Sequence, residues 1–515
     1  MPNEILLDMQ KVSKRFGTVV ALDGVDLTIQ KGEVHGLLGG NGAGKTTLMN
    51  ILYGLYQSDS GQVMLDGERI ATQSPRDAIR SGIGMVHQQF LQINRFSVTE
   101  NIVLGTDLRN WPKMDLEPVK ETIRTLARRF GLPVDPDAHI SDLPMGVRQR
   151  VEILKALYRG VKVLVLDEPT TNLTPQEVDD LFESLRVMVD DGLSVIFITH
   201  KLREVLEVCD RISVLRRGTN VLTMDRQDAT EEALVNAMVG TDLDVEASII
   251  FAPQRLDPLF EQMDQKAVLE LDDLTVGEGQ LIGLKGCSLT LQAGEILGVA
   301  GVSGNGQLEL IEGVLGLQPV IKGRVVLTGI DVSELETHQI LKRSVAYVPE
   351  DRWQDGFLPT ANVAQNLILG QHRQPPYSDG RLLHRPVIYD RSADLIEEFD
   401  IKTPGPQDTA GNLSGGNIQR VMLARAFARS VDLLLLHNPT RGLDIPSTEF
   451  VYNKILERKQ EGMGTLLISE NLDELFLMSN RIVVLSQGEM MGELARGAFD
   501  RYALGRMMSG VRQRE

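Results

Sequence analysis

Several features that would mark a secreted or membrane-spanning protein are missing from the sequence. Its 515 residues include only two cysteines, Cys209 and Cys287, which both stand among apolar neighbours. Such a sequence has no disulfide framework, and a reducing compartment is expected. The first residues lack a basic stretch followed by an apolar core, so no secretory signal peptide is predicted. No run approaches the ~20 apolar residues that cross a bilayer.

An excess of positive charge is also missing. The net charge is −18, and the broad basic surface that binds nucleic acid is not expected, so a nucleic-acid partner is excluded from the prediction. We interpret the acidity as a contribution to solubility. Apolar residues make up 42% and charged residues 24%, as in ordinary globular proteins. At roughly 150 residues per domain, the length allows about two to four domains.

The chain contains two related halves. Lys45 and its glycine-rich surroundings align with Gln307, 262 residues later, whereas His200 aligns with Glu470, 270 residues later. The growing offset predicts a small insertion in the second half after Gln365, placed most simply in the proline-rich run 371–386. The predicted organisation is a first domain at 1–240, a linker at 241–267 and a second domain at 268–515.

The pattern of apolar runs predicts an α/β fold in each half. The segments 33–38, 161–166 and 194–198 are strand-like and are separated by helical patterns. Such runs are typical of a parallel sheet that is buried on both faces. Residues 90–141 are mostly helical in pattern, which predicts an inserted helical subdomain.

A phosphate-binding loop follows the predicted strand 33–38. Its glycines allow backbone N–H groups to close around phosphate oxygens, and the helix behind it adds a favourable dipole. Lys45 is predicted to reach the β- and γ-phosphates, and Thr46 to bind Mg²⁺. The residues of this loop are Gly39, Gly40, Asn41, Gly42, Ala43, Gly44, Lys45 and Thr46.

Two acidic residues end an apolar strand in the same half. The strand delivers Asp167 to a metal ion, and Glu168 is placed to polarise the attacking water as a general base. Alone, this pattern would fit a buried strand that ends in two solvated acids equally well. Beside a phosphate-binding loop in the same half, it predicts nucleotide hydrolysis.

The sequence Leu413-Ser414-Gly415-Gly416-Asn417, followed by Ile418-Gln419-Arg420, resembles the signature of ABC-type ATPases. The resemblance covers nearly the whole chain and implies two tandem P-loop NTPase domains that bind ATP and Mg²⁺. It implies that the signature residues Ser414, Gly415, Gly416 and Asn417 cap the γ-phosphate bound by the opposite half. It further implies that Phe16 stacks on adenine, Thr47 contributes to the loop, Gln88 is the Q-loop glutamine near the metal, His200 contacts the γ-phosphate, and Asp444 lies in the D-loop.

The fused form is similar to the ATPases of simple-sugar and nucleoside importers. The passages 142–153, 347–352 and 438–444 carry this likeness. It implies two transmembrane permeases, an extracytoplasmic substrate-binding protein and a peripheral location at the cytoplasmic face of the inner membrane. The solute, a nucleoside or a ribose- or galactose-type sugar, stays open, although the passage 85–88 and the Pro144 signature favour nucleosides.

The second half lacks the residues of the hydrolytic site. Gln307 and Leu308 stand in place of Lys45 and Thr46, and His437 and Asn438 stand in place of the two acids. Glu350 and Glu470 replace Gln88 and His200. Since glycines 301, 304 and 306 remain, weak nucleotide binding there stays open. The first half has the altered signature, at 143–147, so that the resemblance places all losses in one of two composite sites.

Two other functions are compatible with parts of the sequence. A tandem ABC factor that acts on ribosomes would need two competent sites and a long, usually basic segment between the halves. A nucleotide sensor that does not hydrolyse would not need Glu168. We therefore predict an import ATPase.

Overall fold

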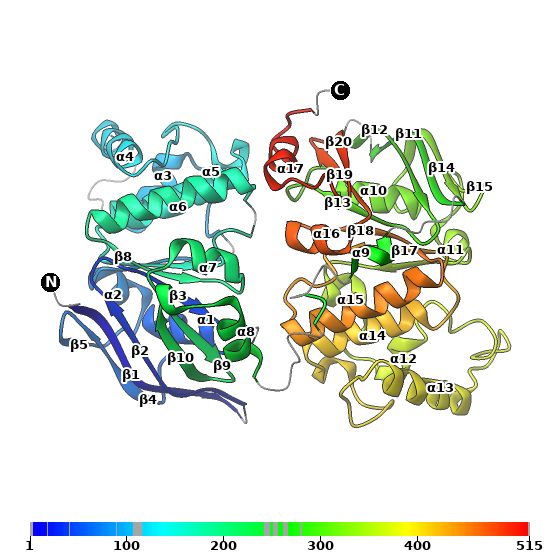
Figure 1. The fold of residues 1–515 in the computed structure, drawn as a ribbon, viewed down its shortest axis with the longest axis horizontal. Coiled ribbons are helices and arrows are strands. Elements are labelled where there is room, and N and C mark those ends of the chain that lie inside the picture. The colour runs from blue at the N-terminus through cyan, green and yellow to red at the C-terminus, as the bar shows by residue number, and fades with distance from the viewer. Residues whose placement is uncertain are drawn as a thin grey trace. The chain divides into compact units, whose positions relative to one another are not determined.

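The computed structural model describes residues 4–17, 19–40, 42–88, 90–106, 116–171, 173–240, 248–250, 256–260, 266–278 and 281–512. The chain forms two compact units, Met1–Val245 and Glu246–Glu515, here called unit 1 and unit 2 (Figure 1). Each unit contains one antiparallel and one mostly parallel sheet, and helices cover the latter. This arrangement confirms the predicted α/β class.

Unit 1 has a four-stranded and a six-stranded sheet. The four-stranded sheet has the order β2 (Val19–Gln30), β1 (Ile5–Phe16), β4 (Ser60–Leu65), β5 (Glu68–Ile70). The six-stranded sheet has the order β10 (Thr219–Asp225), β9 (Arg211–Arg216), β3 (Val34–Leu38), β8 (Ser194–Ile198), β7 (Val163–Asp167), β6 (Ile83–Val86). The helices are α1 (Lys45–Leu52), α2 (Pro75–Arg80), α3 (Val98–Val103), α4 (Glu117–Arg129), α5 (Met145–Tyr158), α6 (Pro175–Asp190), α7 (Leu202–Val208) and α8 (Glu231–Val239).

Unit 2 repeats this plan. Its antiparallel sheet has the order β12 (Leu281–Gln292), β11 (Ala267–Glu278), β14 (Val320–Leu327), β15 (Ile330–Asp331). The second sheet has the order β16 (Val345–Val348), β17 (Leu433–His437), β18 (Gly464–Ile468), β13 (Ile296–Ala300), β19 (Arg481–Ser486), β20 (Glu489–Ala495). The helices are α9 (Asp257–Phe260), α10 (Gln307–Val314), α11 (Thr337–Ile340), α12 (Val363–Leu367), α13 (Arg385–Glu398), α14 (Gly415–Phe427), α15 (Ile445–Gln460), α16 (Leu472–Met478) and α17 (Arg501–Met508).

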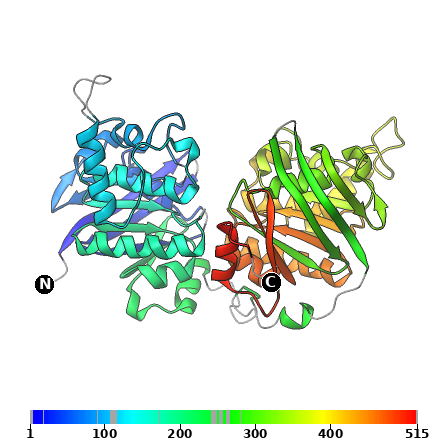
Figure 2. The ribbon, with the colours of Figure 1, turned by 90° about the horizontal axis from the view of Figure 1, so that it is seen from above.

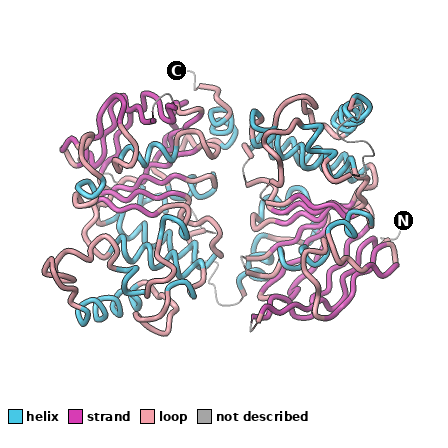
Figure 3. Tube along the Cα trace, turned by 180° about the vertical axis from the view of Figure 1, so that it is seen from behind, coloured by secondary structure: helices cyan, strands magenta, loops and turns pink. Residues whose placement is uncertain are grey.

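The parallel strands are buried on both faces, as their continuous apolar runs predict. In β17, Leu433 and Leu435 pack with the antiparallel sheet and α10, whereas Leu434 and Leu436 pack with α14 and α15. Successive side chains of a strand point to opposite faces, so one strand serves two cores. Figure 2 and the tube in Figure 3 show helices and strands of unit 2 in separate layers.

The antiparallel sheets were not predicted. Strand β1 pairs antiparallel with β2 and β4 rather than joining the parallel sheet. In the helical subdomain of unit 1, helices α3, α4 and α5 lie within or directly after the predicted segment 90–141. Among the described residues, no helix has both the length and the apolar character of a membrane span.

A buried asparagine in each unit shows where the insertion lies. Asn101 Nδ2 donates to the carbonyl oxygen of Ile93 at 3.1 Å, and Asn366 Nδ2 donates to that of Leu358 at 3.0 Å. These equivalent residues are 265 positions apart, so part of the insertion precedes Leu358. This part coincides with a π-helical turn at Arg352–Gly356. The prediction placed the whole insertion after Gln365, and it is therefore wrong for the residues that are inserted before Leu358.

Part of the predicted linker packs on unit 2. Leu256 and Phe260 are buried in its core, and the Arg496 guanidinium lies 3.9 Å from the centre of the Phe260 ring. Asn480 Nδ2 donates to the Phe260 carbonyl at 3.1 Å. Residues 241–247, 251–255 and 261–265 lie outside the described residues. Cys209 and Cys287 are buried free thiols.

Candidate functional site

The predicted catalytic residues of unit 1 gather at one edge of its parallel sheet. Strands β3, β8 and β7 are neighbours and run parallel, so their carboxyl ends meet. The phosphate-binding loop follows β3, Glu168 follows β7, and His200 follows β8 by two residues. Ligands of open α/β sheets bind outside such carboxyl ends.

The loop backbone requires glycine where it turns into α1. Gly44 has φ 105° and ψ 0° and precedes the helix. A Cβ atom there would lie 2.7 Å from Leu22 Cδ2 and 2.8 Å from the Ala21 carbonyl oxygen, so no other residue fits. The tight turn delivers Lys45 into the interior of the loop.

Lys45 is a buried cation that is held by the loop itself. Its Nζ donates to the carbonyl oxygens of Gly39 at 2.6 Å and Gly40 at 3.1 Å. Burial lowers the pKa of Lys45, while the carboxylates of Glu168 and Asp167 act in the opposite direction. A desolvated ammonium bonded to neutral carbonyls suits an anionic ligand such as a phosphate.

Glu168 is the centre of a polar cluster. His200 Nδ1 lies 2.9 Å from its Oε1 atom, and Gln88 Nε2 donates to its Oε2 atom at 3.2 Å. Burial raises the pKa of Glu168, but the hydrogen bond and charge of His200, with Lys45, outweigh burial and lower it. The carboxylate is therefore ionised at neutral pH and can accept a proton.

Asp167 is buried at the end of β7 and has an unusual pKa. Asp167 is only 8% exposed to solvent. Burial, followed by the charge of Glu168, raises the pKa of Asp167 to about 6, and Lys45 acts against both. Two acids that share a site in this way favour a bound cation.

The donor set fits a magnesium nucleotide. Mg²⁺ usually takes one or two carboxylates together with substrate phosphates and water. Asp167 and the exposed Thr46 could hold it, and the loop with Lys45 could hold the phosphates. Within the described parts of the chain, no cluster of three or more His, Cys, Asp or Glu residues forms an all-protein metal cage. Thr47 lies in the first turn of α1, and Asn41 lies outside the described residues.

Phe16 stands at the exposed end of β1. Its residue is 43% exposed, and its ring makes an edge-to-face contact with Tyr56 at 5.3 Å between centroids. Lys14 Nζ lies 5.6 Å from the same ring. An exposed aromatic supported in this way has a face for a planar ligand.

The signature residues begin α14 in unit 2. The Ser414 side chain caps the helix by accepting from the Asn417 N–H at 3.4 Å, and the Asn417 amide nitrogen lies 2.9 Å from the same Ser414 oxygen. Gly415 and Gly416 form the first turn. Asp444 caps α15, where its Oδ1 accepts from the Ser447 N–H at 3.0 Å.

In unit 2, the loop that is equivalent to the phosphate-binding loop is filled by the side chain of Gln307. Gln307 Nε2 donates to the Val302 carbonyl at 3.0 Å, and its Oε1 accepts from the Asn305 N–H at 2.9 Å. A Cβ atom on Gly301 would lie 2.2 Å from Gln307 Nε2. The side chain in the place of Lys45 thus fills the loop and uses one of its N–H groups.

The acids of unit 1 are replaced by a different network in unit 2. Glu350 forms an ion pair with Arg441, and His437 Nε2 lies 3.4 Å from the other Glu350 oxygen. Burial lowers the pKa of His437 to about 4, so that it is neutral at pH 7. Asn438 Oδ1 accepts from the Glu470 N–H at 2.9 Å.

One buried carboxylate that supports the site was missed in the sequence. Glu204 accepts from the hydroxyls of Thr170 at 2.6 Å and Thr199 at 3.0 Å, and so joins the loops that follow Glu168 and precede His200. Glu474 makes the equivalent bonds to Thr440 and Ser469 in unit 2. The sequence could have indicated this role, because Thr170, Thr199 and Glu204 each have an equivalent in unit 2 that stands 270 residues later.

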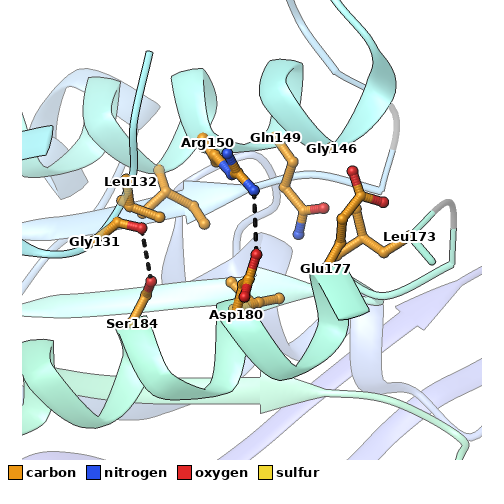
Figure 4. Close-up of a pocket in the computed structure, with 11 residues that line it drawn as sticks. Gly131, Leu132, Gly146, Gln149, Arg150, Leu173, Glu177, Asp180 and Ser184 are labelled. Carbon is orange, nitrogen blue, oxygen red and sulfur yellow. Dashed lines mark hydrogen bonds and ion pairs between the residues drawn. The ribbon is translucent and has the colours of Figure 1, made fainter. Parts of the chain in front are cut away.

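A small gap lies between α5 and α6 of unit 1 (Figure 4). It holds about 10 Å³ and is lined by residues such as Gly131, Gln149 and Ser184, so it is a packing gap rather than a ligand pocket. At its edge Glu177 approaches α5 so closely that a Cβ on Gly146 would lie 2.2 Å from Glu177 Oε1.

Comparisons with known proteins agree with these features. A family model described as ABC transporter matches residues 22–171 and 284–441. A nucleoside import ATP-binding protein of Lactococcus lactis subsp. cremoris (strain MG1363) is 42% identical, with 99% of each chain covered. A glucose import ATP-binding protein of Haloferax volcanii is 40% identical over 99% of this chain and 96% of its own length. A guanosine import ATP-binding protein of Bacillus subtilis (strain 168) is 38% identical over 99% of each chain.

Proposed function

Because this chain belongs to the ABC transporter family and is an ATPase of that family, we propose that it hydrolyses ATP to power the import of a nucleoside or a simple sugar. The observation that carries this proposal is the cluster at the sheet edge of unit 1. There a buried Lys45, an acidic pair and His200, 2.9 Å from Glu168, occupy the position where such folds bind nucleotides.

Each residue of the cluster has a separate part in the proposed reaction. Lys45 and the loop N–H groups hold the β- and γ-phosphates, and Thr46 and Asp167, with Gln88 nearby, hold Mg²⁺, which neutralises charge on the phosphates. Glu168 accepts a proton from the attacking water. His200 donates to a γ-phosphoryl oxygen, and Phe16 stacks on the adenine.

The signature and the D-loop of unit 2 complete the proposed site. Ser414, Gly415, Gly416 and Asn417 would face the γ-phosphate held by the loop of unit 1, together with Asp444. The sorting of substitutions supports this pairing, because the intact signature and the intact loop lie in different halves. Random decay would not divide them in this way.

The proposed partners are membrane permeases. The similar proteins are named as import ATP-binding proteins, and we propose two permeases, served by an extracytoplasmic binding protein, at the cytoplasmic face of the inner membrane. Leu91 and Ile93, which follow Gln88, are 65% and 37% exposed. Exposed apolar side chains beside a nucleotide site suit a docked permease helix.

A matched pair of substitutions tests the hydrolytic assignment. Glu168→Gln should lower ATP turnover by a factor of about 10² or more while ATP binding persists, because only the general base is lost. Asn438→Ala, at the equivalent position of unit 2, should change turnover little. Steady-state phosphate release and equilibrium ATP binding measure both effects. The reverse order, with Asn438→Ala inactive and Glu168→Gln active, would contradict the proposal.

A further inference from the structure

Arg352 lies in a segment of unit 2 that is longer than the equivalent segment of unit 1. It opens the π-helical turn Arg352–Gly356, which coincides with part of the insertion. The corresponding segment of unit 1, 88–93, is three residues shorter than 350–358 and contains no arginine. The turn packs tightly on α14, since a Cβ atom on Gly356 would lie 2.9 Å from Met422 Sδ.

The guanidinium of Arg352 connects two parts of the proposed site. Its Nη2 donates to the carbonyl oxygen of Arg441, in the segment that leads to Asp444. Its Nη1 lies 3.5 Å from where a Cβ on Gly415 would stand. Arg441 is itself held by the ion pair with Glu350, two residues before Arg352. Glu350 and Arg352 therefore both bind Arg441, and Arg352 also lies beside the start of α14.

The two signature glycines each face a neighbour. Gly415 faces Arg352, and a Cβ on Gly416 would lie 2.7 Å from Ser447 Oγ of α15. The first turn of α14 is thus held between the inserted turn and α15. In unit 1, Met145 stands in place of Gly415, Thr171 in place of Arg441 and Gln88 in place of Glu350. Unit 1 therefore keeps none of the three residues that form this arrangement in unit 2.

The charge of Arg352 is unfavourable for the isolated helix. A helix N-terminus carries partial positive charge, so that a cation beside it is repelled unless an anion is present. Burial also lowers the pKa of the Arg352 guanidinium, which is the mark of a desolvated cation. Both costs are relieved when an anionic group binds at Ser414 and Gly415.

We propose that Arg352 is a positioning residue for ATP hydrolysis, which fixes the first turn of α14 against the Arg441 segment and adds positive charge where the γ-phosphate is received. Glu350 supports it by holding Arg441. This inference rests on the proposed function, because it concerns the helix that we assign to the γ-phosphate. ATP binding itself stays with unit 1.

The test measures kcat and KM for ATP in the full-length chain. Arg352→Met should lower kcat about tenfold and leave KM within twofold, because the loop of unit 1 is unchanged. Arg352→Lys should recover most of the lost kcat, since it keeps the charge. Glu350→Gln, which installs the residue of unit 1, should lower kcat in the same direction. Arg324→Met, at an exposed arginine of β14, is the control and should have wild-type kcat.

Four outcomes test the inference and the proposed function on which it rests. A kcat within twofold of wild type in Arg352→Met overturns the inference, and equal losses in the methionine and lysine variants overturn the part assigned to charge. Ser414→Arg tests the underlying proposal: if it retains full turnover, the signature assignment itself fails. Thermal unfolding and ATP binding of each variant show whether a low kcat reflects a fold defect, and a tenfold rise in KM in Arg352→Met would also contradict the inference.

Discussion

At the residue scale, the buried carboxyl group of Asp167 lowers the stability of the folded protein at neutral pH. A carboxyl group whose pKa is raised on folding resists ionisation in the folded state. For Asp167, with a pKa of about 6 against an ordinary value of 3.8, the cost is fully present above pH 6 and disappears below about pH 4. A bound cation would remove it at neutral pH. This cost at neutral pH agrees with the proposal that Asp167 binds a metal ion.

We therefore expect Asp167→Asn to stabilise the nucleotide-free protein at pH 7.5. The neutral amide avoids the cost of a buried charge, and a shift of roughly two pKa units corresponds to about 2–3 kcal/mol at most. The gain should fade between pH 6 and pH 4, while turnover is lost at every pH. Urea unfolding at pH 7.5 and at pH 4.5 measures the difference.

Glu183→Gln serves as the control for this prediction. Glu183 is an exposed acid on α6, so its change should leave the free energy of unfolding nearly unaltered at both pH values. A stabilisation by Asp167→Asn that is equally large at both pH values would show that Asp167 is not the titrating group.

The candidate site residues and their order could be proposed from the sequence, but the electrostatics of the cluster could not. Lys45, Asp167, Glu168 and His200 stand in recognisable order along the chain. The raised pKa of Asp167 depends on burial and on Glu168, which are known only from the fold. The pairing of Glu350 with Arg441 was missed because the residues are 91 positions apart in the sequence.

At the scale of elements, the strand-to-helix turn has the same backbone in both units. Gly44 and Gly306 each precede a helix with φ 105° and ψ 0°. Unit 2 therefore keeps the conformation of this glycine before the helix, although Gln307 has replaced the lysine. The conformation belongs to the turn itself, and the ligand chemistry is added to it by the side chains.

This equivalence predicts different results for two glycine substitutions. Gly44→Ala should weaken ATP binding at least tenfold, because a Cβ would collide with Leu22 and Ala21 and displace Lys45. Gly306→Ala carries similar backbone strain and should lower thermal stability, but ATP affinity should change less than twofold. Equilibrium ATP binding and thermal unfolding distinguish them; a loss of affinity in Gly306→Ala equal to that in Gly44→Ala would show that both loops bind nucleotide.

Predicting the elements from apolar patterns succeeded where a strand was buried on both faces. The runs that became β3, β7 and β8 are continuous and could be assigned to a parallel sheet. The partner of β1 could not be found, because β2 alternates exposed and buried positions over 12 residues and its pairing depends on distant strands. The inserted turn at Arg352–Gly356 was missed because the total offset between the repeats does not show how the extra residues are divided along the chain.

At the scale of the whole molecule, two units of one plan stand in a single chain. Separate subunits would need to associate to supply both a loop and a signature, whereas this chain carries both. We expect one copy of the chain in the assembled transporter. Native mass spectrometry of the complex with its permeases measures the copy number, and two copies would contradict the expectation.

The turn after β7 and its equivalent after β17 have one further consequence. Glu168 and Asn438 both have φ 46°, a left-handed conformation that strains most side chains but suits asparagine. In unit 1 this position holds Glu168, the acid that we propose as general base. In unit 2 it holds asparagine, which tolerates a positive φ better than most residues other than glycine. The proposed role of Glu168 would therefore be kept at a cost in backbone strain that Asn438 largely avoids.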